Sequence, residues 1–389
     1  MPFDPQAATA AYIDSLGADT LAKAAAYTNG SHWLILWNLV VTVVVSVVII
    51  RSGLLERVER WLGRRGASMR VMAVSVVYFI AAALLSLPWS IYAGWWRERS
   101  YGRSSQPFAD AFMQELLSTV IFSVLAGLFF IGVYALIRRA GRRWWLWSGA
   151  LAFVGISAGL LIAPVAIQPL FNQYKPVPEG SVREALATMA RDSGIAPDRI
   201  FVFDGSRQSN NFTANVSGVG PTARIAISDV ALKGASLDEV RAVTAHEIGH
   251  YVRHDVWRQV ALLSALALAA FFVVDRTYGR VAAALGSRAP LASPCSLPVV
   301  VVMVSVLSLV TVPLVNAFVR SGETEADRYS LQTVNLPDAL SAALVKTAEY
   351  RYPRPTELQE WLFYSHPSVE RRVRMAMDWK ATHDAAPQK

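Results

Sequence analysis

Uncharged hydrophobic blocks alternate with polar segments along this chain of 389 residues. Five blocks have 18 or more residues without a charged side chain, which is enough for a helix to cross about 30 Å of hydrocarbon. A sixth block has 15 residues and needs its flanking turns to cross. Any one block could be a buried core helix, but a soluble core does not accommodate five of them in one chain. The pattern therefore predicts six membrane spans, over residues 33–50, 71–96, 116–137, 144–171, 260–274 and 297–319.

Two polar segments interrupt the spans and divide the chain. The first contains an amphipathic pattern over 181–193 and two short apolar runs at 199–204 and 223–228, which predict one helix and two strands. The second is charged, helical in pattern and broken by prolines. Because an even number of spans separates the two segments, both return to the same side of the membrane. We expect four parts: a four-span membrane domain at 1–171, an α+β segment at 172–255, a two-span hairpin at 256–319 and a helical segment at 320–389.

Composition and charge support a membrane protein. Hydrophobic residues make up 53% of the chain and the formal net charge is +8, with six arginines at 51–70 and four at 138–143, beside the spans. This placement suits anionic membrane lipids, whereas no interleaved basic and aromatic surface for nucleic acid accompanies it. The one cysteine, Cys295, excludes an intrachain disulfide and a zinc cluster of the cysteine type. The first 30 residues are too polar for the apolar core of a secretory signal.

The sequence His246-Glu247-Ile248-Gly249-His250 has the chemistry of a zinc hydrolase. Positions i and i+4 share a helix face, so His246 and His250 can offer two imidazole nitrogens to one zinc ion, with Glu247 beside the water that the metal holds. Ser236 and Glu239 form a capping-box pattern that predicts the start of this helix, and the next helix breaker is far downstream. The alternative interpretation is a pair of structural histidines on a helix face.

A catalytic zinc site usually needs a third protein ligand. His254 would lie one turn further along the same helix, but three histidines in a row, with the outer pair about 12 Å apart, cannot converge on one ion. Glu323 follows the sixth span, and Asp327 lies one helical turn later on the same face. Glu323 could therefore ligate zinc while Asp327 accepts a hydrogen bond from a ligating imidazole. By spacing alone, a charged helix start just outside the membrane fits equally well.

These two patterns together resemble the M48 metallopeptidases, in their Ste24-type CAAX prenyl protease branch. In that family, as in this chain, H-E-x-x-H is followed after a pair of spans by E-x-x-A-D. Further similar segments extend the resemblance from Leu87 to Val373: Leu87-Pro88 with Ser90, Tyr92, Glu98, Tyr101-Gly102 and Gln106; Pro169 to Asn172; Pro176 with Pro178-Glu179-Gly180; Asp204 to Arg207; Ser209-Asn210; and His366-Pro367 with Arg372.

The resemblance implies an α-helical integral membrane zinc metalloendopeptidase, with about six transmembrane helices that enclose a chamber and a small α+β zincin-like domain at its end. It implies one zinc ion per chain, held by His246, His250 and Glu323, with Glu247 as the general base. Asp327 would orient a ligand, His366 would face the oxyanion and Arg372 would brace the site. An edge strand would pair with the substrate backbone, and it would comprise Asn210, Asn211, Phe212, Thr213, Ala214 and Asn215.

The chain departs from the family pattern in several ways. Asn215 stands where the family usually has glycine, and six spans are predicted where eukaryotic members have seven. The Arg- and Ala-rich composition is typical of bacteria, so we expect an inner-membrane enzyme whose substrates are extended or membrane-associated peptides and proteins, lipid-tethered ones included. The positive-inside rule places the zinc domain outside the cytoplasm, because the arginine-rich short loops lie on the opposite side, whereas the resemblance places it inside.

Two other functions fit parts of the pattern. A catalytically inactive membrane scaffold or chaperone that retained the fold would have a broken zinc set, and none of the expected groups is missing here. A transporter would carry ionisable residues within its spans, whereas Glu115 and Asp275 lie only at their ends. The sequence therefore favours a membrane metallopeptidase.

Overall fold

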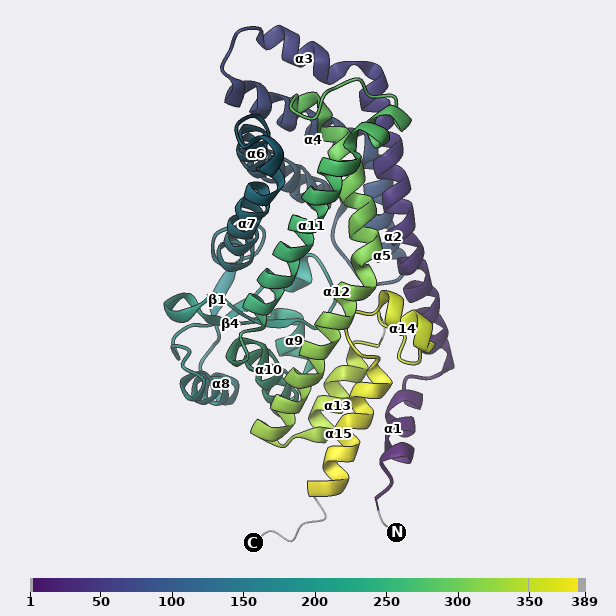
Figure 1. Ribbon diagram of the computed structural model, residues 1–389. Helices are drawn as coiled ribbons and strands as arrows, with labels where there is room; N and C mark the ends of the chain where they lie inside the picture. The colour runs from purple at the N-terminus through teal and green to yellow at the C-terminus, as the bar shows by residue number, and fades with distance from the viewer. Residues whose placement is uncertain (1–2, 349, 384–389) are drawn as a thin grey trace.

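The computed structural model describes residues 3–348 and 350–383. A bundle of long helices forms one end of the elongated molecule, and a smaller unit of helices and strands forms the other end, where both chain termini lie (Figure 1). The fold is the predicted one, an α-helical membrane protein with a small α+β unit.

Six helices in the described part of the chain are long and apolar enough to cross a membrane, which confirms the predicted number. Five of the six spans extend beyond the uncharged block that predicted them, whereas the fourth ends at Ala166, five residues before its block ends. The short block at 260–274 lies within a helix of 30 residues, so its length no longer limits the span. The second span continues from α4 through a π-helical segment, η1 (Ile91–Trp96), into α5 (Arg97–Ser100). The six are α2 (Ala18–Ser52), α4 (Ala67–Ser90), α6 (Phe108–Arg139), α7 (Trp144–Ala166), α11 (Asp255–Ala284) and α12 (Leu297–Val334).

The outward faces of these helices are apolar, as contact with lipid requires. Val44 on α2 and Val310 on α12 are 55% and 71% exposed. Some polar groups inside the bundle pair with one another, as where Trp144 on α7 donates its indole N–H to Asp275 on α11 at 2.6 Å. Because lipid tails offer no hydrogen-bond partner, such contacts stabilise the packing of the spans.

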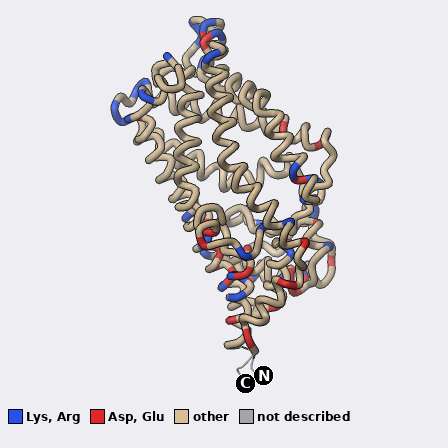
Figure 2. The backbone as a smooth tube through the Cα atoms, turned by 90° about the vertical axis from the view of Figure 1, so that its right-hand side faces the viewer, with Lys and Arg blue, Asp and Glu red and all other residues tan. Residues whose placement is uncertain are grey.

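The short loops at the end of the bundle far from the sheet are rich in Lys and Arg (Figure 2). One of these connections contains the amphipathic helix α3 (Leu54–Leu62), and another contains the short helix η2 (Gly141–Arg143). Leu55 and Leu62 bury the apolar face of α3 against the bundle, which leaves its arginines outward. The basic loops and the sheet thus lie at opposite ends of the molecule, as the order of the spans predicts.

A four-stranded sheet with the order β1-β2-β4-β3 forms the core of the smaller unit. Strands β2 (Ile200–Phe203) and β4 (Arg224–Ser228) are the two predicted ones, and they pair in parallel at its centre. The sequence does not predict β1 (Tyr174–Pro176), which pairs antiparallel with β2 at an edge, where proline is tolerated. The predicted amphipathic helix is α8 (Ser181–Asp192), which packs on this sheet.

The edge strand beside β4 starts later than predicted. It is β3 (Ala214–Ser217), so only Ala214 and Asn215 of the predicted residues 210–215 belong to it. Asn210 instead donates its backbone N–H to the carbonyl oxygen of Arg103 at 2.8 Å, whereas the carbonyl oxygen of Thr213 accepts from the backbone N–H of Ser228, the last residue of β4, at 2.9 Å. The prediction of a strand is therefore wrong for residues 210–213.

Helix α10 (Leu237–Val252) carries both histidines and begins where the capping box predicts. The backbone N–H of Glu239 donates to Oγ of Ser236 at 3.2 Å, and the backbone N–H of Ser236 donates to Oε2 of Glu239 at 2.6 Å. The short helix α9 (Asp229–Gly234) precedes it. Helices α12 and α13 (Pro337–Lys346) pack against α10. Helix α14 (Glu357–Phe363) packs on α12, α15 (Val369–His383) packs on α13, and α1 (Pro5–Asp14) packs on α15.

The end of α10 differs from the prediction. The helix ends at Val252 and does not continue through His254, which adopts φ 56° in the left-handed region and directly precedes α11. His254 is therefore not on the same helix as His246 and His250. A turn separates it from them, and its side chain is exposed.

His254→Gly is expected to raise the stability of the protein by up to about 1 kcal/mol, because glycine adopts positive φ without the steric cost that a Cβ incurs. Metal content should not change. The melting temperature in detergent measures the stability, and metal analysis measures the bound zinc. Val252→Gly, at an exposed helical position, is the control and should lower the melting temperature. A lower melting temperature for His254→Gly would contradict the expectation.

Candidate metal centre

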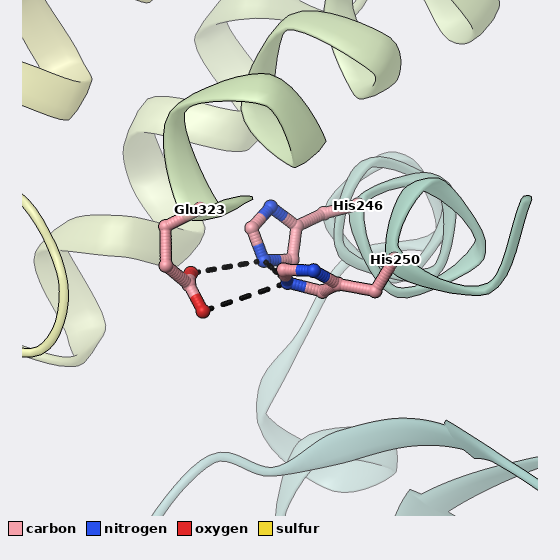
Figure 3. A group of neighbouring side chains, drawn as sticks. All are labelled: His246, His250 and Glu323. Carbon is pink, nitrogen blue, oxygen red and sulfur yellow. Dashed lines mark hydrogen bonds and ion pairs between the residues drawn. The ribbon is translucent and has the colours of Figure 1, made fainter. Parts of the chain in front are cut away.

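Helices α10 and α12 bring three metal-ligating side chains together. His246 and His250 project from α10 toward Glu323 on α12 (Figure 3). The two imidazole Nε2 atoms lie 3.2 Å apart, and they face carboxylate oxygens of Glu323 at 3.3 Å and 3.5 Å. One ligand atom from each side chain lies within 4.8 Å of the other two. The three residues predicted as ligands thus converge on one point.

Small residues let the two helices approach closely enough for this convergence. A Cβ at Gly249 would come within 3.2 Å of both the Cα of Ala326 and the Cβ of Tyr329. Ala326 is itself fully buried at this contact. Since interiors are close-packed, larger side chains here would push α12 away from α10. Gly249 and Ala326 therefore keep Glu323 within reach of the imidazoles.

A carboxylate lies behind each imidazole. His246 Nδ1 is 2.8 Å from Oδ1 of Asp327, and His250 Nδ1 is 2.9 Å from Oδ2 of Asp255. A carboxylate that accepts the Nδ1 proton leaves the lone pair of Nε2 free for a metal. The sequence predicts Asp327 in this position but not Asp255, because the chain turns back toward His250 only through the left-handed residue before it.

Arg372 on α15 holds Asp327 from the other side. Its Nε donates to Oδ2 at 2.7 Å and its Nη2 donates to Oδ1 at 2.6 Å. Arg372 is 7% exposed and Asp327 is fully buried, so water does not compete for this two-pronged contact. The predicted bracing residue therefore reaches His246 through Asp327.

Asp255→Ala is expected to weaken zinc binding by about 10- to 100-fold, because His250 keeps its Nε2 but loses the group that orients the ring. Competition with a chelator of known affinity measures the change. Asp238→Ala, which removes an exposed carboxylate from the first turn of α10, is the control and should bind zinc like wild type. Equal zinc affinity for Asp255→Ala and wild type would show that the contact does not orient the ring.

Glu247 lies beside the three ligands with an uncommitted carboxylate. Within residues 3–348 and 350–383 it makes no hydrogen bond or ion pair. Two cavities, of about 380 and 350 Å³, meet at His246, Glu247, Glu323 and His366. Burial raises the pKa of the Glu247 carboxyl above its ordinary value. The group is therefore placed to take up a proton from a molecule in either cavity.

His366 reaches the same point from the segment between α14 and α15. Its Nε2 lies 3.1 Å from Oε1 of Glu323, and its Nδ1 lies 3.0 Å from Oγ of Ser365. Burial lowers the pKa of His366 to about 4. The imidazole is therefore neutral near pH 7 and has one N–H to donate.

The smaller of the two cavities has walls that the sequence predicts only in part. Asn215 lies within β3 opposite Ala226, and Asn210 donates its side-chain N–H to the carbonyl oxygen of Gly102 at 3.0 Å. The segment between these two residues lines the cavity. Tyr350 and Arg351, which follow α13, also line it. The sequence does not predict this position for them, because they belong to no motif and lie in a short polar run before Pro353. The lining includes Asn211, Phe212, Thr213, Ala214, Tyr350 and Arg351.

Comparisons with protein families match nearly the whole chain. The profile described as "Peptidase family M48" matches residues 176–380, and the profile described as "CAAX prenyl protease N-terminal, five membrane helices" matches residues 5–173. In the second range the described structure has four apolar helices of spanning length, one fewer than that description gives.

Individual proteins show the same similarity over most of the chain. The chain is 26% identical over 363 residues to the Uncharacterized metalloprotease YhfN of Bacillus subtilis, which covers 92% of this chain and 85% of that one. It is 24% identical over 385 residues to the CAAX prenyl protease 1 homolog of Arabidopsis thaliana, with 93% and 88% covered. The crystal structure of S. mikatae Ste24p has the same fold, with a TM-score of 0.76 at 19% identity over 92% of this chain and 89% of that chain.

Proposed function

Because the chain belongs to peptidase family M48 and is a membrane zinc metalloendopeptidase of the CAAX prenyl protease type, we propose that it hydrolyses peptide bonds at the centre formed by α10 and α12. One observation carries the proposal. His246, His250 and Glu323 converge at a cavity that also receives the uncommitted carboxylate of Glu247. Ligands and a base at one place are the minimum that metal-assisted hydrolysis requires.

The side chains at this centre fit one zinc ion per chain. His246, His250 and Glu323 would hold it, since two imidazole nitrogens and one carboxylate are a usual donor set for catalytic zinc. Asp327 and Asp255 keep both imidazoles in the ligating tautomer. When bound, zinc supplies a Lewis acid that makes water more acidic and polarises the peptide carbonyl.

Glu247 acts as the general base in this proposal. Its carboxylate takes a proton from the water that attacks the peptide carbonyl, and it passes the proton to the nitrogen of the departing amine. One carboxylate serves both steps, since it accepts the proton from water and then releases it to the amine.

His366 and Arg372 have separate tasks. The neutral imidazole of His366 lies at the junction of the two cavities, where its N–H can donate to the oxygen that gains negative charge during attack. Arg372 positions His246 by holding Asp327, and its charge is neutralised by that contact.

The walls of the site suit an extended peptide. Strand β3 is at the edge of the sheet, and the residues that lead into it line the smaller cavity. Such an edge holds a peptide by main-chain hydrogen bonds and makes little demand on its side chains. Glu323 lies on the same helix as the sixth span, so membrane-associated peptides and proteins, lipid-tethered ones included, are the proposed substrates.

Paired peptides test the proposed function. Zinc-loaded protein in detergent should cleave a plain extended peptide and its farnesylated counterpart, since the site recognises backbone and not the lipid. Mass spectrometry of the products gives the cleaved bond. Failure to cleave either peptide would overturn the proposed function, and cleavage of the farnesylated peptide alone would overturn the broad substrate range.

A further inference from the structure

We infer that Arg351 binds a carboxylate group of the peptide in the cavity beside the metal centre, and so gives the enzyme a preference for substrates that carry one there. The inference rests on the proposed peptidase function. Arg351 would be a specificity determinant that lies outside the H-E-x-x-H and E-x-x-A-D motifs.

Arg351 stands at the junction of two cavities. It lies between α13 and α14 and lines the cavity of about 350 Å³ together with His246, Glu247 and Glu323. It also lines a neighbouring cavity of about 170 Å³, which shares His366 with the first. A peptide bound at the metal centre would therefore extend toward this guanidinium.

The charge of Arg351 has no partner in the described part of the chain, where it makes no hydrogen bond or ion pair. The other arginines nearby are committed, since Arg372 contacts Asp327 and Arg354 contacts Asp14 and Glu370. Arg351 is half-buried, and burial lowers its pKa. Placing a cation away from bulk water is costly unless an anion arrives to pair with it.

The carboxylates at the metal centre are not available to be this anion. Glu323 faces the two imidazoles, and Glu247 is needed as a free base. Neither carboxylate makes a hydrogen bond or ion pair with Arg351 within the described residues. Since no described carboxylate pairs with Arg351, we infer that the partner is a group on the molecule that enters the cavity.

Stacking on Tyr350 helps to fix the position of the guanidinium. The Cζ of Arg351 lies 5.7 Å from the centre of that ring, and the Cζ of Arg103 lies 4.5 Å from it. A guanidinium held over an aromatic ring keeps its planar fork of N–H donors in one orientation. This fork matches the two oxygens of a carboxylate.

Two groups on a peptide have this chemistry, the free C-terminal carboxylate and the side chain of Asp or Glu. A matched peptide set distinguishes them: one sequence as the C-terminal acid and as the C-terminal amide, and a second amidated sequence that carries either Glu or Gln at each position after the cleaved bond. The variants are Arg351→Gln, Arg351→Lys and, as a control with its ion pairs outside the cavity, Arg354→Gln.

Arg351→Gln should lower kcat/KM about 10- to 100-fold for the carboxylate-bearing member of at least one pair, mainly through KM, and leave its neutral counterpart unchanged. Arg351→Lys should recover part of the loss, because it retains the charge but not the fork. Arg354→Gln should show the wild-type preference, and all variants should bind zinc equally. The peptide pair that responds shows whether Arg351 binds the C-terminal carboxylate or the side chain of an acidic residue.

An equal effect of Arg351→Gln on both members of every pair would overturn the inference and leave the proposed function standing. Absence of any cleavage by the wild-type protein would instead overturn the proposed function, and this inference with it.

Discussion

Glu247→Gln is expected to slow peptide hydrolysis by about 100- to 10,000-fold, which is the usual contribution of a general base. Glutamine has nearly the same shape and can still hold water by a hydrogen bond, but it cannot accept the proton. Glu247 has no hydrogen bond or ion pair within the described residues, so the substitution breaks no contact that supports the fold. Turnover measured at saturating peptide reports the loss.

Zinc content separates this loss from damage to the metal site. Glu247→Gln should bind zinc like wild type, because the three ligands and the carboxylates behind them remain. Glu184→Gln, an exposed position on α8, is the matched control and should keep full activity. Turnover of Glu247→Gln equal to that of wild type would remove this residue from the mechanism.

Glu323→Ala is expected to reduce zinc affinity by more than about 100-fold. Even partners that only orient a ligand contribute about 10- to 100-fold to metal affinity, so the loss of one of three ligands should exceed that range. The structure adds a second reason. The carboxylate faces both imidazoles and His366, and without it three imidazoles would face one another without an anion.

Glu325→Ala is the control for this prediction, since its carboxylate pairs with Arg253 and Arg328 at the surface, two residues further along α12. Metal analysis after gel filtration measures zinc per chain for both variants. His254→Ala should retain zinc as well, because the turn after α10 keeps that side chain exposed. Loss of zinc in His254→Ala with retention in Glu323→Ala would reverse the ligand assignment.

Much of the fold could be predicted because each region has a single dominant physical cause. Long apolar blocks have few stable alternatives to membrane spans, so all six were recognisable, and the capping box at Ser236 fixes the start of α10. The end of α10 depends on His254 adopting a left-handed conformation, which histidine seldom does and sequence patterns do not signal. Strand β1 could not be predicted either, because its pattern does not indicate a strand. This proline-containing segment forms a strand only because an edge of the sheet is available to it.

In the candidate site too, some residues could be predicted from the sequence and others could not. The spacing in H-E-x-x-H predicts that His246 and His250 share a face, but the approach of Glu323 depends on packing between two helices far apart in the chain. By spacing alone, a zinc ligand and a charged helix start were equal interpretations of Glu323. The resemblance to a family favoured the ligand, and it alone suggested His366 and Arg372. Asp255 lies five residues from His250, a separation that places it behind the ring only because a turn intervenes. Arg351 follows no motif, and its lack of a partner among the described residues becomes visible only when the surrounding helices are in place.

One measurement tests the central claim most directly: zinc per chain and peptide hydrolysis determined on the same preparations of wild type, Glu247→Gln and Glu323→Ala. Wild type is expected to contain one zinc ion and to cleave the peptide. Glu247→Gln should contain zinc without cleaving, and Glu323→Ala should show neither zinc nor cleavage. Equal hydrolysis by all three preparations, whatever their zinc content, would contradict a metal-assisted peptidase centred on α10 and α12.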